Sequence, residues 1–235
     1  MFSKTDEENL MHLRRVFEKC RKYGISLNPK KKLFSLEEGK LLGHNISKED
    51  IRIDPSRVEV VLKIDPPMNK KEVQSFIGRI NFLKRFIPNL AEILRSITNM
   101  LKKDFDIKWN SEARKYFSEV NLSLTTAPIL INLDFTKYFM LFSFASDHTI
   151  ASVLLQKNSE GQEQPIAFFN RALKDASLKY NIMGKQAFSL VKSLKDVRVY
   201  ILYSHIIAYV PNAILKDILA QIDADRKGEN EFLLC

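Results

Sequence analysis

Among the charged side chains of this sequence, which could bind ligands of opposite charge, the basic ones are in excess. The 235 residues include 37 lysines and arginines against 28 aspartates and glutamates, so the formal net charge is +9 at pH 7. A basic excess of this size favours anionic partners, nucleic acid among them, because opposite charges attract. The alternative at this level is an ordinary basic protein without such a partner.

Histidines and cysteines, which could hold a transition metal or form a disulfide, are few and scattered. His44, His148 and His205 have no partners at ligand spacing, and Cys20 and Cys235 provide neither a disulfide framework nor a metal motif. Unpaired cysteines are typical of a reducing intracellular compartment, here cytoplasm or nucleus. The polar start of the sequence indicates no secretory signal, and no apolar run approaches the roughly 20 residues of a membrane span.

The first half of the sequence predicts helices with a small set of strands. A capping-box pattern at residues 5–8 begins a helix, and Gly24 ends it. Short apolar pairs between glycine, proline and charged residues over 25–47 predict small antiparallel strands. After a short helix, a longer one begins at the capping residue Asn69, with apolar side chains at helical spacing. Because glycine weakens a helix interior, we expect another backbone to approach Gly78 closely.

Two further helices are predicted over residues 90–103 and 110–127, and the period then changes from helical to strand-like. The predicted strands are 138–144, 150–156, 165–170 and 205–210. A long helix precedes the last of them, another helix follows over 212–222, and residues 223–235 show no clear period. This order predicts an α+β or mixed α/β protein, with a mixed α/β domain that begins near residue 130.

One collinear series of motifs covers nearly the whole chain: FSKTDEENLMHLRRVFEKCRKYGISLNPKKKLF with GKLLGHNIS, IDPSRVEVVLKIDPPMNKKEVQSFIGRINFLKRFIPNLAEI, LFSFASDHTIASVLLQ, PIAFFNRAL and KYNIMGKQAFSLVKSL. This series resembles the Pol polyprotein of gypsy-type LTR retrotransposons. The resemblance implies a remnant of the reverse transcriptase palm at residues 1–54 and a helical thumb and connection at 55–130. It further implies a ribonuclease H-like domain with a mixed sheet and flanking helices at 131–222, and an irregular tail at 223–235.

The family's polymerase site is a Tyr-x-Asp-Asp turn that lies just upstream of its FSK motif. This sequence begins at Met1 and Phe2 without that turn. We therefore expect no polymerisation by this chain alone.

The family's ribonuclease H chemistry uses two Mg²⁺ ions held by clustered carboxylates. The positions of those acids match Phe144, Gln186 and Pro211, in FAS, GKQ and VPN where the family has Asp-Ala-Ser, Glu-Lys-Glu and Thr-Asp-His. The resemblance thus implies a degenerate domain without catalytic activity or bound metal, with Mg²⁺ in active relatives only. We expect Phe144 to fill the hollow left by the metals. Asp147 should point away or lie in a turn, and Asp217 is too far along the chain to replace the lost acids.

A thumb of this family holds a duplex mainly through the phosphate backbone, which makes binding sequence-independent and sensitive to salt. Phe82 and Phe86 beside the basic residues are candidates for stacking on sugars or bases, with core packing as the alternative. For each basic residue the alternative is an ordinary solvated helix face. The predicted nucleic-acid-binding residues are Lys30, Lys31, Lys32, Lys70, Lys71, Arg79, Lys84 and Arg85.

The resulting hypothesis is a retrotransposon-derived, catalytically defective fragment that binds RNA–DNA or DNA duplexes weakly and has no membrane partner. A plant element is the expected source, because YVPNAILKDIL resembles plant members in which a degenerate ribonuclease H domain serves as a connection. Two alternatives stay open. One is a domesticated module that docks a host protein through this scaffold, which an exposed apolar patch on the former catalytic face would favour. The other is a decayed reading frame without a selected function.

Overall fold

The computed structural model describes residues 6–28, 38–103, 105–201, 204–211 and 232–234. Contacts divide the chain into two units, Met1–Glu37 and Glu38–Cys235, and each is described by itself. Within the described residues, no helix is both long enough and apolar enough to cross a membrane.

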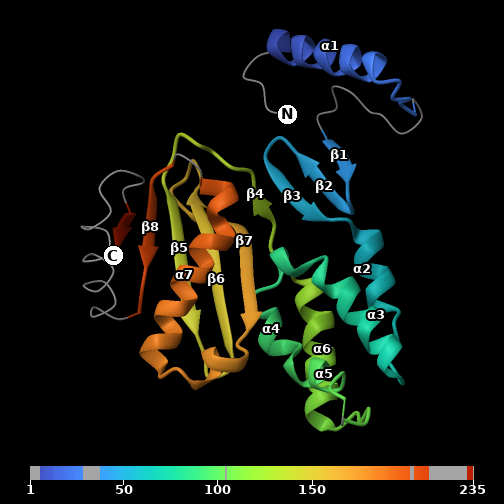
Figure 1. Ribbon diagram of the computed structural model, residues 1–235, viewed down its shortest axis with the longest axis vertical. Coiled ribbons are helices and arrows are strands. Elements are labelled where there is room, and N and C mark those ends of the chain that lie inside the picture. The colour runs from blue at the N-terminus through green and yellow to red at the C-terminus, as the bar shows by residue number, and fades with distance from the viewer. Residues whose placement is uncertain (1–5, 29–37, 104, 202–203, 212–231, 235) are drawn as a thin grey trace. The chain divides into compact units, whose positions relative to one another are not determined.

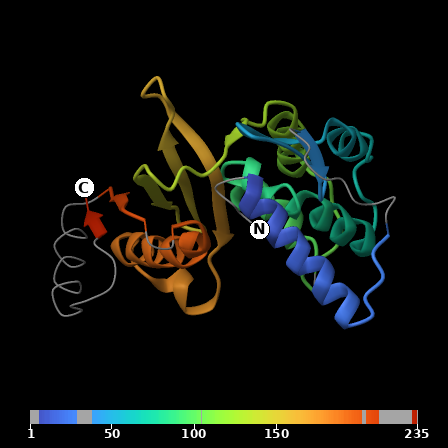
Figure 2. The same ribbon diagram turned by 90° about the horizontal axis from the view of Figure 1, so that it is seen from above.

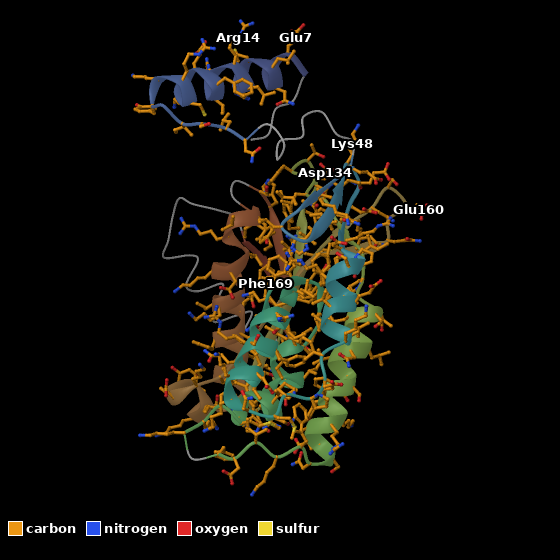
Figure 3. All side chains as sticks on the ribbon, turned by 90° about the vertical axis from the view of Figure 1, so that its right-hand side faces the viewer. Glu7, Arg14, Lys48, Asp134, Glu160 and Phe169 are labelled. Atoms are coloured by element: carbon orange, nitrogen blue, oxygen red, sulfur yellow. The ribbon has the colours of Figure 1, made fainter. Side chains whose placement is uncertain are left out.

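The described part of the first unit is one helix and the turn that ends it. α1 spans Asp6–Lys22, and Glu7 and Arg14 are exposed along it (Figure 3). Gly24 adopts a left-handed backbone with φ of +63°, which is how glycine commonly ends a helix and as the sequence predicts. The basic cluster predicted at residues 30–32 lies outside the described residues.

A four-stranded antiparallel sheet opens the second unit, in the order β1-β2-β3-β4. Its strands are β1 (Glu38–Leu41), β2 (His44–Ser47), β3 (Asp50–Ile53) and β4 (Leu130–Ile131). The first two confirm the antiparallel strands predicted for this region. β4 comes from far along the chain, and the Asn132 side chain next to it donates hydrogen bonds to the carbonyls of Ser47 and Lys48, at 2.8 and 2.9 Å. These bonds attach β4 to the turn between β2 and β3.

Helices fill the stretch between β3 and β4 (Figure 1). They are α2 (Pro55–Leu62), α3 (Lys70–Asn81), the 3₁₀ turn η2 (Lys84–Phe86), α4 (Leu90–Ile93), α5 (Arg95–Asn99) and α6 (Ser111–Thr125). The side chains of Asn69 and Asn110 accept the backbone N–H of Glu72 and Ala113, at 2.9 and 2.8 Å. A side-chain oxygen in this place satisfies an otherwise unpaired donor of the first turn, so these residues set where α3 and α6 begin, as predicted.

The helix predicted over residues 90–103 is two short helices instead. Leu94 has a ψ of −4°, far from the value near −42° of a regular α-helix, and it separates α4 from α5. Apolar residues from the α-helices α2 to α6 form one core, which includes Phe76, Ile80, Ile97 and Val120. The predicted apolar face of α3 is buried, as its spacing required.

The rest of the second unit is a five-stranded mixed sheet in the order β7-β6-β5-β8-β9. Its strands are β5 (Phe139–Ala145), β6 (Thr149–Lys157), β7 (Glu163–Ala172), β8 (Ile206–Tyr209) and β9 (Phe232–Leu234). β5, β6 and β7 are antiparallel neighbours, whereas β8 runs parallel to β5 and β9 parallel to β8. The predicted mixed α/β class is confirmed.

One face of this sheet is covered by α7 (Ile182–Ile201), which follows the 3₁₀ turn η3 (Asp175–Lys179) (Figure 2). Leu141 of β5 packs in a buried core with Leu190 and Val197 of α7. Because strand side chains alternate, Phe142 and Phe144 lie on the opposite face. The helix predicted over 212–222 lies outside the described residues, and the predicted irregular tail contains β9, a strand too short to show a period.

Polar side chains join the helices to the five-stranded sheet. The Asn170 side chain accepts the backbone N–H of Ala91 at 2.9 Å and donates to the carbonyl of Ile87 at 3.3 Å. The hydroxyl of Thr149 donates to Glu92 at 2.9 Å. The helices and this sheet therefore share hydrogen bonds within one contact unit, and the four-part division predicted from the sequence stays a prediction.

Candidate functional site

A groove between α2 and α3 gathers basic and aromatic side chains. Its volume is about 340 Å³, and its lining residues are Arg57, Val60, Val61, Ser75, Gly78, Arg79, Phe82 and Leu83. Arg57 and Arg79 are exposed, and neither forms an ion pair with a carboxylate among the residues that the structure describes. Two guanidinium groups without carboxylate partners on an open groove can bind a phosphate or another anion by donating hydrogen bonds to it.

Gly78 forms part of the groove floor and has open space above it. A Cβ built on this residue would meet no heavy atom within 4 Å, so the expectation that another backbone approaches Gly78 is wrong. The helical period explains the difference, because Gly78 lies off the buried stripe of α3. The missing side chain instead leaves room in the groove for a ligand to approach the helix backbone.

Phe82 stands at the end of the groove in a stack of cationic and aromatic groups. Its side chain is 41% exposed, and the guanidinium carbon of Arg57 lies 5.3 Å from its ring centre. His44 stacks on the same ring at 5.2 Å with planes only 7° apart, and its ring centre is also 5.2 Å from that of Phe86. Phe86 is fully buried, so core packing holds for Phe86, while Phe82 keeps an accessible edge.

The β1–β2 hairpin forms one wall of this stack. Gly43, just before His44, has a φ of +76°, and a Cβ there would lie 2.9 Å from Nε of Arg57 and 3.1 Å from Phe82. Only glycine adopts this backbone without strain and leaves that space free. The hairpin therefore fits closely against the two side chains that border the groove.

The surroundings of His44 disfavour the protonated form of its imidazole. Burial, followed by the charges of Arg85 and Arg57, lowers the pKa of His44 below its ordinary value of 6.5. The imidazole is consequently neutral at pH 7 and contributes to the stack as an aromatic ring.

The predicted basic residues on α3 and η2 fall in different places. Arg79 lines the groove, and Lys71 and Lys84 are exposed. The Lys70 ammonium donates to the carbonyls of Lys102 and Lys103, at 2.8 and 3.2 Å. The Arg85 guanidinium donates to the carbonyl of Ile166 in β7 at 3.3 Å and is half-buried. The structure thus brings Arg79 alone of these residues into the groove.

Sequence reasoning missed Arg57 and the hairpin pair Gly43 and His44. Arg57 lies in the short helix before the double proline, outside the basic stretch 70–85 that the sequence predicts to bind nucleic acid. A glycine before a histidine in a predicted hairpin is a signal for a left-handed turn, yet its proximity to Arg57 and Phe82 depends on tertiary packing.

The positions that the resemblance assigns to the metal-binding acids, Phe144, Gln186 and Pro211, lie near one end of the five-stranded sheet. The parallel register pairs Phe142 with Tyr209, so Phe144 near the end of β5 and Pro211 just after β8 lie at the same end of the sheet. The Ser189 hydroxyl donates to the carbonyl of Phe144 at 2.8 Å, and Gln186 lies one turn earlier on α7. The Phe144 side chain is 56% exposed, however, and does not fill a hollow as expected. Strand alternation directs it to the sheet face that α7 leaves open.

A lysine is buried beside this end of the sheet. The side chain of Lys185 is 8% exposed, and its ammonium donates to the carbonyl of Asp147 at 2.9 Å and lies 3.6 Å from a carboxylate oxygen of that residue. The Asp147 side chain is 85% exposed in the β5–β6 turn, as predicted. Lys185 therefore fastens the first turn of α7 to this turn.

The residues at these positions do not fit a pair of Mg²⁺ ions. They offer a phenyl ring, a pyrrolidine ring and a neutral amide, whose buried Oε1 in Gln186 has no hydrogen-bond partner. Mg²⁺ prefers anionic oxygen, and two adjacent divalent ions repel each other unless carboxylates offset their charge. One amide oxygen cannot supply that charge. No group of three or more His, Cys, Asp or Glu suited to a metal occurs in the described ranges.

Comparison with protein families gives a match over residues 109–208, to the RNase H-like domain found in reverse transcriptase. The match begins in front of α6 and ends within β8, so it covers the last helix before β4 and most of the five-stranded sheet. This part of the chain is thus similar to an RNase H-like domain of the reverse-transcriptase type.

Relatives in sequence include the transposon Tf2-3 and Tf2-4 polyproteins of Schizosaccharomyces pombe. Each is 29% identical to this chain over 199 residues, which are 85% of the chain and 15% of the polyprotein. The chain spans only a small part of the relatives that it matches. This collinear similarity supports the predicted origin in a retrotransposon Pol polyprotein, and the plant source stays a prediction.

Solved structures with the same fold include two of the foamy viral protease–reverse transcriptase. One is in complex with double-stranded DNA, with a TM-score of 0.74 and 23% identity, and covers all of this chain and 44% of the viral chain. The other is in complex with an RNA/DNA hybrid, with a TM-score of 0.75 and 23% identity, and covers all of this chain and 34% of the viral chain. These similarities establish the arrangement of elements as one known from reverse transcriptases.

Proposed function

We propose that this chain, with its RNase H-like domain of the reverse-transcriptase type, binds RNA–DNA and DNA duplexes without cutting them. The observation that carries the proposal is the groove between α2 and α3, where Arg57 and Arg79 flank the open backbone at Gly78 and the accessible ring of Phe82. Guanidinium groups bind phosphate, and the helix surface beside Gly78 allows close approach of a sugar–phosphate backbone.

Two further observations support duplex binding. The formal charge of +9 attracts polyanions at long range. The foamy viral structures with this fold hold double-stranded DNA or an RNA/DNA hybrid. Binding through phosphates makes the affinity independent of sequence and strongly dependent on salt.

The test is a salt titration of binding to an RNA–DNA hybrid, measured by fluorescence anisotropy with the native chain, Arg79→Gln and Arg198→Gln. Arg198 is exposed on α7 and serves as the matched control for the lost charge. We expect Arg79→Gln to weaken binding and to reduce the slope of log K against log salt by about 1, the value for one lost phosphate contact. Arg198→Gln should leave the slope unchanged. Equal slopes for all three proteins would contradict the proposed groove.

We also propose that the ribonuclease H-like domain is catalytically inactive and needs no metal. The chemistry of the donor set supports this, because Phe144, Gln186 and Pro211 provide no carboxylate. The test is a cleavage assay on the RNA–DNA hybrid with and without Mg²⁺. Turnover by the pure protein, at a rate above that of the hybrid alone, would overturn this part of the proposal while leaving duplex binding in place.

A second candidate function is a module that docks a host protein. It is favoured by Phe144, which is 56% exposed beside the half-buried stacked pair Phe142 and Tyr209, whose ring centres are 4.3 Å apart. An exposed aromatic patch on the former catalytic end is the kind of surface that partners bury. Pull-downs that persist after nuclease treatment and disappear with Phe144→Ser would support this function, whereas loss of every partner on nuclease treatment would exclude it.

A further inference from the structure

His44 borders the groove but does not itself contact a phosphate in the proposed binding. Its ring is packed among aromatic and cationic side chains. Its ring packs against those of Phe82 and Phe86, with ring centres 5.2 Å away in each case. Its Nδ1 atom is buried and has no hydrogen-bond partner. An imidazolium carries N–H groups on both nitrogens, so in the free protein its Nδ1–H would have no acceptor.

Within the described part of the chain, the charged groups near this ring are two arginines and one ion pair. Arg57 of α2 lies over Phe82 and Arg85 of η2 lies over Phe86, at 5.3 and 5.8 Å from the ring centres. On the sheet, His44 pairs with Ile53 of β3. The adjacent carboxylate, that of Asp54, is 3.2 Å from the Lys40 ammonium and so is already paired. A proton on His44 therefore adds a third positive charge beside two guanidinium groups.

We propose that His44 couples duplex binding in the α2–α3 groove to the uptake of one proton from solvent. This inference rests on the proposed function. A phosphate held by Arg57 brings negative charge next to the stack and offsets the repulsion that keeps the imidazole neutral. The bound state thus tolerates an imidazolium better than the free state does.

Thermodynamic linkage between proton binding and duplex binding determines how the affinity for the duplex changes with pH. If the complex holds more protons than the free components, the affinity must rise as the pH falls, by no more than about tenfold per pH unit for one proton. The free ring has a pKa below 6.5, because burial and the charges of Arg85 and Arg57 disfavour the cation. Proton uptake on binding should therefore be largest between that lowered pKa and the higher pKa of the bound ring, and it should be absent in the alkaline range.

The binding experiment compares the full-length native chain, His44→Phe and His148→Gln. A blunt DNA duplex of about 20 base pairs is titrated at constant ionic strength, from about pH 7.5 to about pH 5.5. His44→Phe keeps an aromatic ring in the stack and removes the titrating group. His148→Gln is the matched control, because His148 is exposed in the β5–β6 turn. The native chain and His148→Gln should gain about threefold to tenfold more affinity over this interval than His44→Phe.

A second measurement is independent of whether His44→Phe folds well. The ring proton signal of His44, followed by NMR in the native chain, reports its titration with and without the duplex. The pKa of His44 should rise when the duplex is bound. An unchanged pKa overturns the inference, as does equal pH dependence of the native chain and a folded His44→Phe. If the native chain binds no duplex at any pH, the proposed function itself fails, which is a different result from binding that ignores His44.

Discussion

The hydroxyl of Thr149 in β6 donates a hydrogen bond of 2.9 Å to the carboxylate of Glu92 in α4. Thr149 is buried, and the second carboxylate oxygen of Glu92 lies 3.1 Å from the Arg95 guanidinium. The bond therefore links an ion pair among the helices to the first residue of a sheet strand. Hydrogen bonds to charged groups contribute more to stability than neutral ones.

Replacing Thr149 by Val should destabilise the chain by about 1–2 kcal/mol, because the half-buried Glu92 carboxylate then loses a hydrogen-bond donor that water replaces only in part. The measurement is urea unfolding. Thr125→Val is the control, since Thr125 is exposed near the end of α6. If both variants unfold at the same urea concentration as the native chain, the bond to Glu92 does not stabilise the packing.

Substitution of Gly78 separates helix stability from access to the groove. Gly78→Ala should stabilise α3 by about 0.5–1 kcal/mol, because alanine has the higher helix propensity and its Cβ meets nothing within 4 Å. Gly78→Leu should fold equally well and weaken duplex binding, because a large side chain fills the open surface. Thermal unfolding and anisotropy with the hybrid measure the two effects. Native affinity in Gly78→Leu would show that the duplex does not approach this part of α3.

Acid should weaken the fold through His44. The pKa of His44 is lowered in the folded chain by burial, Arg85 and Arg57, so the unfolded chain binds the proton more readily. This contribution to stability is present above the unfolded value of 6.5 and is lost as the pH falls below it. Urea midpoints at about pH 7.5 and about pH 5.5 should therefore differ more for the native chain than for His44→Phe. A larger acid loss in His44→Phe would contradict the sign.

Lys185→Met should destabilise the chain by about 1–3 kcal/mol, because the carbonyl of Asp147 loses its buried donor. Lys195→Met, on the exposed side of the same helix, provides the matched control and should change little. Denaturant unfolding measures both, and hydrogen exchange in the β5–β6 turn should accelerate only in Lys185→Met. Identical unfolding of the two variants would mean that the ammonium does not anchor the turn.

Local signals in the sequence predict most of the elements and the fold class. Asn69 and Asn110 mark helix starts because capping depends on the next three residues alone, and the strands β5, β6 and β7 show their period over several residues. The two-residue strand β4 has no local signal, because its partner β3 lies far away in the sequence. The break at Leu94 is equally invisible, since apolar spacing continues through it.

The groove is less predictable than the fold for the same reason. Arg79 could be named from its place on α3, whereas Arg57 becomes relevant only when α2 packs beside α3. The exposure of Phe144 also could not be predicted from the sequence. Its identity led to the prediction of a missing acid, but its exposure follows from which sheet face α7 covers, and a residue type does not carry that information.

The pairing of β4 with β3 has a consequence for motion. The segment 54–129 leaves the four-stranded sheet after β3 and returns to it at β4. Because β3 and β4 are hydrogen-bonded neighbours, they hold both ends of this helical segment together. The two ends of this segment cannot move away from the sheet that carries the β1–β2 hairpin unless β3 and β4 separate. His44 on that hairpin and Arg57 on the segment both pack on Phe82, so the proposed phosphate contact and the proposed proton acceptor are held together by the same small sheet.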